Sequence, residues 1–217
     1  MRNNKKLLGV TGSMGCGKSY ICKKLVELGR GEVYHINTDL LGREIIGANL
    51  TYIEVRSQVF QKFGYNFQAN DGSVKKKELG SVLFQDKTAL KSFNNIILPH
   101  ALELLDKQIK GIKSELVLVE SALFAEHNFF DIVGYNMLLV YANLETQMDR
   151  LSRADLPMEQ IIGRINSQFS TQEKLEKIIQ AQKESNSGKL FLFDTTNNPD
   201  ISKYELLFEV IRGGSRK

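Results

Sequence analysis

A chain of 217 residues is long enough for one domain with its own core, with room for a smaller subdomain inserted into it. Its composition, 42% hydrophobic and 25% charged, excludes the disordered and fibrous classes. The formal net charge of +4 suits an enzyme that handles anionic small molecules, and no basic stripe interleaved with aromatics points to a nucleic-acid partner.

Cysteine usage and the N-terminal sequence bear on the cellular setting. The two cysteines, Cys16 and Cys22, form neither a disulfide framework nor a zinc pair, which favours a reducing cytoplasm. The N-terminal MRNNKK has charge but no apolar region long enough for secretion, and no apolar run reaches transmembrane length. We therefore expect a cytoplasmic protein with no membrane partner, whereas the oligomeric state is not predicted.

Hydrophobic periodicity predicts strands that alternate with helices along the chain. The strands are expected at residues 6–11, 33–36, 115–120, 137–142 and 189–194. The helices are expected at residues 18–28, from about 38, at 52–63, 75–84, 87–110, 145–153, 158–168, 171–182 and 201–211. Pro99 should start a fresh helix or kink the existing one, because proline cannot continue the helical hydrogen bonding.

The order of these elements predicts an α/β fold with a doubly wound, five-stranded parallel sheet. Residues 115–120 and 137–142 are nearly continuous apolar runs, as strands covered on both faces require. The stretch from about 50 to 110 contains no predicted strand, which indicates an inserted helical subdomain within the single domain 1–217.

A glycine-rich loop follows the first predicted strand and opens the first predicted helix. It matches the pattern G-x-x-x-x-G-K-[ST] with Gly12, Ser13, Met14, Gly15, Cys16, Gly17, Lys18 and Ser19. Glycines allow successive backbone N–H groups to point at phosphate oxygens, and the helix N-terminus favours an anion. The alternative, a plain connecting turn, explains neither the Lys-Ser pair nor the flanking elements. We therefore predict an ATP or GTP site over residues 12–20, including Tyr20.

Within this loop, two side chains have predicted tasks. Lys18 is expected to reach the β- and γ-phosphates as a catalytic charge, and Ser19 to hold Mg²⁺. Cys16 is expected to be inert, although its alkylation would block the loop.

From these residues onward, the chain resembles the dephospho-CoA kinase family of P-loop kinases, which are similar to nucleoside-monophosphate kinases. The resemblance is carried by GVTGSMGCGKS, VYHINTDLLGREII, FGYNFQANDGSVKKKELGSVLF, VLVESALFAEH, LVYANLETQMDRLSRA, GRINSQ and FLFD, and it covers nearly the whole chain. It implies ATP-dependent phosphorylation of the 3′-hydroxyl of dephospho-CoA to give CoA, the last step of coenzyme A biosynthesis. It also implies that residues 50–110 bind the acceptor.

The resemblance makes Asp39 the general base that takes the proton of the acceptor hydroxyl. Its position after the second strand suits this role, because ligands bind at the carboxyl edge of open α/β sheets. The alternative is that Asp39 only caps the next helix. Arg43 lies one helical turn later, where it can pair with Asp39, contact the acceptor or stay a surface arginine.

Residues 145–185 resemble a lid that closes over ATP. Arg150, Arg153 and Arg164 fall in its helices, and the resemblance favours Arg150 as a catalytic arginine on the transferred phosphoryl group. The alternative is that these are solvated helix-face arginines. Thr195 stands where the family has an asparagine near adenine, so no contact to the base is predicted there.

The chain departs from the family pattern at several positions. These are Asn37, Leu98, Ala122 and Lys189-Leu190, which replace an aspartate, a histidine, a proline and an Ala-Asp pair. They leave two alternatives open: a kinase of another nucleoside or nucleotide acceptor, and a nucleotide-binding regulator without catalysis.

Other features receive structural interpretations. The three histidines, His35, His100 and His127, have no metal-ligand spacing and are expected in structural or surface positions. Lys75–Lys77 reads as a solvated helix start, with contact to a CoA phosphate as the alternative. The GTPase-like D-x-x-G at 131–134 lacks a following guanine motif and is attributed to chance.

Overall fold

The computed structural model describes residues 5–153 and 158–213, except for the side chains of residues 160 and 164. Its sheet contains five parallel strands in the order β2-β3-β1-β4-β5. They are β1 (Lys6–Thr11), β2 (Val33–Asn37), β3 (Leu116–Glu120), β4 (Met137–Tyr141) and β5 (Leu190–Asp194). The order reverses direction on either side of β1, as in a doubly wound sheet, and this confirms the predicted fold class.

The chain folds into two compact units, each with its own packing. The first comprises residues 1–37, 112–156 and 168–217 and contains the whole sheet. Its helices are α1 (Lys18–Leu28), α6 (Phe124–His127), α7 (Leu144–Ser152), α9 (Thr171–Ser185) and α10 (Ile201–Arg212), with a 3₁₀ turn η3 (Phe130–Val133).

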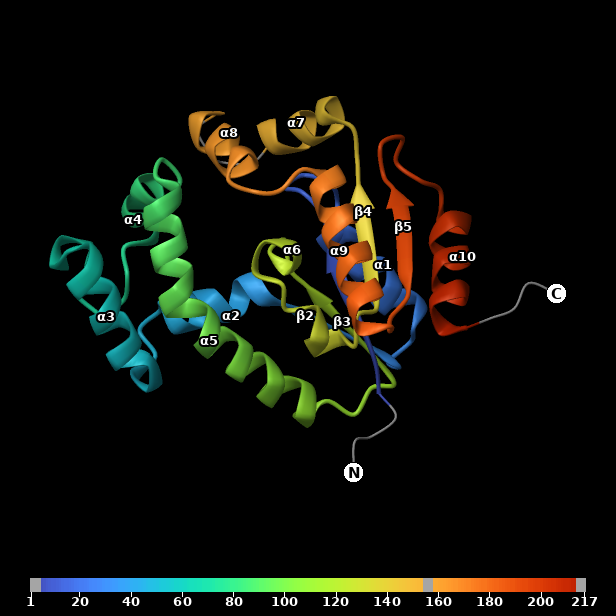
Figure 1. The fold of residues 1–217 in the computed structure, drawn as a ribbon, viewed down its shortest axis with the longest axis horizontal. Helices are drawn as coiled ribbons and strands as arrows, with labels where there is room; N and C mark the ends of the chain where they lie inside the picture. Colours follow the sequence, from blue (N-terminus) through green and yellow to red (C-terminus); the bar gives the residue numbers. More distant parts are fainter. Residues whose placement is uncertain (1–4, 154–157, 214–217) are drawn as a thin grey trace. The chain divides into compact units, whose positions relative to one another are not determined.

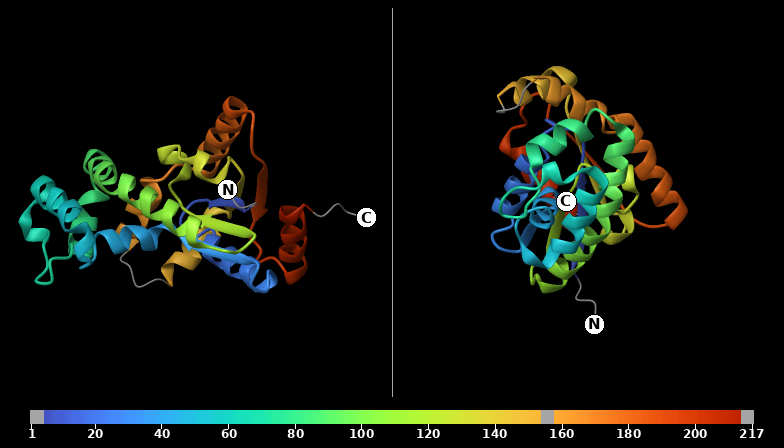
Figure 2. Two further views of the ribbon diagram at one scale, coloured as in Figure 1. Left: turned by 90° about the horizontal axis from the view of Figure 1, so that it is seen from below. Right: turned by 90° about the vertical axis from the view of Figure 1, so that its left-hand side faces the viewer.

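Helices cover both faces of this sheet (Figures 1 and 2). On one face, α1 and α10 pack on a core that includes Leu8, Val10 and Leu118 of the central strands. On the other, α9 contacts β4, and α6 places Phe124 near Gly9 and Met137. The middle of each central strand is therefore covered by apolar side chains on both faces. Polar functional groups are expected at the strand ends.

The second unit comprises residues 38–111 and 157–167. It is helical, with α2 (Thr38–Ile45), α3 (Ile53–Phe63), α4 (Lys76–Leu83), α5 (Lys87–Gly111) and α8 (Met158–Asn166), and with the 3₁₀ turns η1 (Leu50–Tyr52) and η2 (Tyr65–Phe67). Its own core is built around Ile45, Val59, Phe60 and Leu79. Arg56 is buried beside it and donates to the carbonyls of Asn49 (2.6 Å) and Gly72 (2.9 Å), which joins two loops of this unit.

The predicted elements agree with the observed ones to within a few residues at their ends. Of the two outcomes expected at Pro99, a fresh helix is not observed, because Pro99 stands inside the continuous helix α5. This helix changes direction partway along its length (Figure 1), as the missing N–H of proline allows. The short helix α6 and the turn η3 had no periodic signal, because each spans only four residues. Across the described parts of the chain, none of the helices combines the length and the apolar character that a membrane crossing needs.

Candidate active site at the phosphate loop

The phosphate loop occupies the turn between β1 and α1. β1 ends at Thr11, α1 begins at Lys18, and β1 lies between β3 and β4 in the sheet. The loop therefore opens at the carboxyl end of the central strand. The pattern is a phosphate-binding loop only when it follows a strand and opens a helix, and this loop does both.

At two glycines of this loop a side chain would clash with the backbone of a neighbouring element. Gly12 has φ +148°, and a Cβ there would lie 2.1 Å from the carbonyl oxygen of Val140. Gly15 has φ +79°, and its Cβ would lie 2.9 Å from the carbonyl oxygen of Gln147. Larger residues at either position would therefore push the loop away from β4 or α7.

Several polar groups of the loop form hydrogen bonds within the loop, and the Met14 N–H bonds to a residue far along the chain. The Lys18 ammonium donates to the carbonyls of Gly12 (2.9 Å) and Ser13 (3.0 Å), while the Cys16 N–H donates to Ser13 O (3.3 Å). The Met14 N–H donates to Oε1 of Gln168 at 3.2 Å. The loop thus presents a lysine and an amide donor whose present partners are neutral oxygens, which phosphate oxygens can replace.

The side chains of Cys16 and Tyr20 differ in their exposure to solvent. Cys16 is buried, and burial raises the pKa of its thiol, so it stays protonated and unreactive. Tyr20 is exposed, and its ring meets that of Tyr204 edge to face at 6.0 Å. The side chain of Tyr20 therefore packs against α10, and any part it takes in nucleotide binding remains a prediction.

Ser19 meets a carboxylate that sequence reasoning missed. Its hydroxyl donates to Oε1 of Glu120, the last residue of β3, at 2.6 Å. A hydroxyl beside a carboxylate supplies the hard oxygen ligands that Mg²⁺ prefers, so this pair fits the metal of a phosphate-loop site. The sequence does show an acid at the end of an apolar strand. Whether that acid lies near Ser19 depends on which strands are neighbours in the sheet.

The other oxygen of Glu120 is held by β2. His35 Nε2 lies 2.8 Å and Asn37 Nδ2 3.3 Å from Glu120 Oε2. Burial alone would raise the pKa of this carboxyl, yet the hydrogen bonds from His35 and Ser19 and the charge of Lys18 bring it below its usual value. Glu120 is therefore an ionised, hydrogen-bonded carboxylate beside the loop.

Arg150, on α7, braces the loop against the segment after β5. Its guanidinium donates to Thr195 O (2.7 Å), Thr195 Oγ1 (2.9 Å) and Gly15 O (3.2 Å), and the Thr195 hydroxyl donates to Cys16 O (2.8 Å). The arginine thus contacts the backbone of the loop itself. Its predicted contact with a phosphoryl group remains a prediction.

Comparison with known proteins decides the family. The sequence model of the dephospho-CoA kinase family matches residues 6–186, which is most of the chain. The chain belongs to the dephospho-CoA kinase family. The family is one of kinases, so the predicted enzyme class is confirmed, and membership implies ATP as the phosphoryl donor.

Individual relatives agree with this assignment. The chain is 32% identical to the dephospho-CoA kinase of Dehalococcoides mccartyi over 79% of its length and 84% of the relative's. It is 27% identical to that of Listeria monocytogenes with the same coverage. Among solved structures, TT1252 from Thermus thermophilus has the same fold, with a TM-score of 0.72 at 20% identity over 99% of this chain and 100% of that one. The dephospho-CoA kinase from Campylobacter jejuni superimposes with a TM-score of 0.59 at 22% identity, over 97% and 100% of the two chains.

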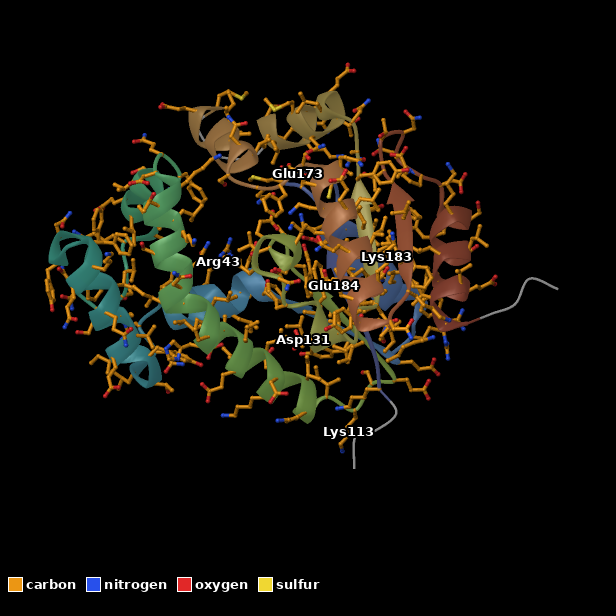
Figure 3. All side chains as sticks on the ribbon, in the orientation of Figure 1. Arg43, Lys113, Asp131, Glu173, Lys183 and Glu184 are labelled. Carbon is orange, nitrogen blue, oxygen red and sulfur yellow. The ribbon has the colours of Figure 1, made fainter. Side chains whose placement is uncertain are left out.

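The two residues predicted to serve the acceptor lie on α2, in the second unit. Asp39 is in its first turn, two residues after the end of β2, and Arg43 is in its last turn (Figure 3). Both are exposed, as residues that meet a diffusing substrate need to be. Their roles as base and acceptor ligand, which the resemblance to this kinase family implies, remain predictions.

Of the two remaining arginines of the predicted lid, the structure describes the side chain of one. Arg153 is exposed and pairs with Asp149 at 2.7 Å, one turn earlier on α7. The side chain of Arg164 and residues 154–157 of the predicted lid lie outside the described residues.

Of the features given structural interpretations, His35 is the one that the structure brings to the site. Cys22, His35 and Glu120 offer ligand atoms within 4.8 Å of one another, although Cys22 belongs to the apolar core and burial raises the pKa of its thiol well above the usual value. Asp131 lies in η3 and, with Glu184 of α9, lines a hollow on the first unit (Figure 3). Lys75 donates to the carbonyl of Asn66 at 3.0 Å.

Proposed function

We propose that this chain transfers the γ-phosphoryl group of ATP to the 3′-hydroxyl of dephospho-CoA, giving CoA and ADP. The observation that carries the proposal is the phosphate loop, with the Ser19 hydroxyl on the Glu120 carboxylate, in a chain of the dephospho-CoA kinase family. The acceptor comes from the family's name, and the loop supplies the donor site.

The residues of the first unit serve the donor in this proposal. The backbone N–H groups of the loop and the N-terminus of α1 bind phosphate oxygens, and Lys18 exchanges its bonds to Gly12 and Ser13 for the β- and γ-phosphates. Ser19 and Glu120 would hold Mg²⁺, and the ion would supply positive charge that neutralises part of the charge on the phosphates. Arg150 keeps the loop braced while this charge develops.

The second unit serves the acceptor. The 3′-oxygen forms a bond to the γ-phosphorus while the bond from that phosphorus to the β–γ bridging oxygen breaks, and ADP leaves with that oxygen. The proton of the hydroxyl passes to the carboxylate of Asp39, a step typically worth about 10²–10⁴-fold in rate. In this proposal Arg43 binds the acceptor, residues 50–110 form its binding subdomain, and residues 145–185 form a lid that excludes water.

Two free thiols, Cys16 and Cys22, support a reducing, cytoplasmic setting for this reaction.

An acceptor panel tests the proposal. Purified protein is given ATP, Mg²⁺ and either dephospho-CoA or one of several nucleosides and nucleoside monophosphates, ADP release is followed, and the product is identified by mass. Turnover with dephospho-CoA and a product heavier by one phosphoryl group is expected. Turnover with a nucleotide but not with dephospho-CoA would establish the alternative kinase, and a protein that binds ATP but phosphorylates no acceptor would be the regulator.

Asp39→Asn separates chemistry from binding. We expect a fall in kcat of about 10²–10⁴-fold with ATP binding retained, because the amide cannot accept the hydroxyl proton. Unchanged turnover would show that Asp39 is only a helix-start residue.

A further inference from the structure

The strand register places two polar side chains of β2 beside the acid at the end of β3. β2 and β3 are parallel, with Asn37 opposite Glu120 and His35 opposite Leu118. Residues two apart on a strand share a face, so His35 and Asn37 lie on the same side of the sheet. Their contacts with Glu120, which also reaches Ser19 at the start of α1, show that this is the side covered by α1.

The two oxygens of Glu120 have separate partners. Oε1 accepts the Ser19 hydroxyl at 2.6 Å, while Oε2 lies 2.8 Å from His35 Nε2 and 3.3 Å from Asn37 Nδ2. An ionised carboxylate can only accept, so His35 must carry its proton on Nε2 to make this bond. One oxygen is therefore fixed to the sheet, and the other is presented to the loop.

We propose that His35 is a positioning residue that holds the Glu120 carboxylate so that Oε1 faces Ser19, and that it thereby sets the affinity of this pair for Mg²⁺. The inference rests on the proposed function, because it concerns the metal of the same phosphate-loop site. His35 touches neither phosphate nor metal in this role and acts through Glu120.

The physical reason is the freedom of a glutamate side chain. An unanchored glutamate side chain loses rotamer entropy when it is ordered, and a metal would have to order it at the moment of binding. The bond from His35 orders it in advance. Outer-shell partners of this kind typically change metal affinity by about 10- to 100-fold.

His35 and Asn37 are the neighbours that hold Oε2 of Glu120, because the nearby Cys22 thiol cannot do so. The Cys22 thiol, the third member of the cluster, is fully buried in the apolar core, and burial together with the charge of Glu120 keeps its pKa well above the usual value. A protonated thiol is a weak donor and gives the carboxylate no strong hydrogen bond. The His35 side chain is 23% exposed, so its replacement disturbs little of the core.

Three variants of β2 test the inference. His35→Leu removes the donor, and His35→Gln keeps an N–H at a similar distance along the side chain. Tyr34→Leu is the matched control, because Tyr34 lies on the opposite face of the same strand and is 49% exposed. Binding of a non-hydrolysable ATP analogue is measured by calorimetry, first in EDTA and then as Mg²⁺ is titrated, and thermal unfolding is recorded for each variant.

For His35→Leu we expect analogue binding in EDTA equal to the wild type, and about a 10-fold higher Mg²⁺ concentration for half-maximal tightening. His35→Gln should restore most of the difference, and Tyr34→Leu should behave as the wild type. In turnover, His35→Leu should need more Mg²⁺ and reach a similar kcat at saturating Mg²⁺.

An unchanged Mg²⁺ dependence in His35→Leu overturns the inference. So does an equal loss of binding with and without Mg²⁺, because that result marks a merely structural role. If the wild type binds the analogue but gains nothing from Mg²⁺, the metal part of the proposed function is wrong. If it binds no nucleotide at all, the proposed function fails as a whole.

Discussion

Glu120 at the end of β3 and Glu126 in α6 lie six residues apart, and both side chains are about nine-tenths buried, yet their surroundings differ. Glu120 accepts the Ser19 hydroxyl, and its other oxygen lies beside the His35 imidazole and the Asn37 amide. Glu126 pairs with the ammonium of Lys174, a fully buried side chain of α9, and accepts the Phe169 N–H at 2.9 Å. Among the described residues no lysine or arginine forms a salt bridge with Glu120, whereas the charge of Glu126 is paired with that of Lys174.

The difference shows which buried acid is suited to a metal. A carboxylate that is already paired with a lysine gains little from a second cation, whereas a carboxylate without a lysine or arginine partner keeps more of its attraction for Mg²⁺. Lys174 also donates to the Ala122 carbonyl at 2.6 Å, so its pair with Glu126 ties α9 to the segment after β3. Burial lowers the pKa of Lys174, and Glu126 opposes that shift. We therefore assign Glu120 to the site and Glu126 to stability.

The largest expected effect is on the structural pair. Lys174→Met leaves Glu126 buried without its cation, which should lower the free energy of unfolding by about 3–5 kcal/mol. Urea unfolding measures this. The double variant Lys174→Met/Glu126→Leu should recover most of the loss, because no unpaired charge remains; a single variant as stable as the wild type would contradict the assignment.

Next in size is the effect of neutralising the site carboxylate. Glu120→Gln should lower kcat/KM by about 10- to 100-fold, because the amide binds Mg²⁺ poorly, and should change the free energy of unfolding by about 1 kcal/mol or less. Glu126→Gln is the matched control and should show the reverse pattern, with loss of stability and near-normal turnover. Equal loss of activity in both variants would remove the distinction between the two acids.

A smaller effect is expected from a substitution at Thr195, which with Arg150 holds the phosphate loop through hydrogen bonds that involve no acidic side chain. Thr195→Val removes the hydroxyl that donates to Cys16 O and accepts from Arg150, which should destabilise the protein by about 1–2 kcal/mol and raise the KM for ATP several-fold. Thr195→Ser keeps the hydroxyl and should stay close to the wild type. Thermal unfolding and initial rates over a range of ATP concentrations measure the two effects.

The smallest effect concerns His127, next to Glu126 at the end of α6. Burial lowers the pKa of His127, so the unfolded chain binds a proton more readily than the folded one, and stability falls as the pH drops below the usual histidine pKa of about 6.5. The loss between pH 7 and pH 5 should be smaller in His127→Gln, by about 1 kcal/mol or less. Urea unfolding at a series of pH values measures it, and parallel curves for the two proteins would exclude a contribution from His127.

Local sequence determined most of the elements and the position of the phosphate loop. The phosphate loop is a contiguous pattern, so Gly12, Lys18 and Ser19 were predicted as site residues without knowledge of the fold, and the structure places the pattern between β1 and α1. The apolar runs of β3 and β4 identified buried parallel strands for the same reason, since hydrophobic periodicity is a local property.

Tertiary structure decided which polar residues meet. Glu120 is 101 residues from Ser19 and 85 from His35, and it reaches both because β3 lies between β2 and β1. Lys174 and Glu126 likewise meet only because α9 packs against α6. The sequence alone offers two acids, one at the end of β3 and one six residues later. The order of strands and helices makes Glu120 a partner of the loop and Glu126 one half of a buried ion pair.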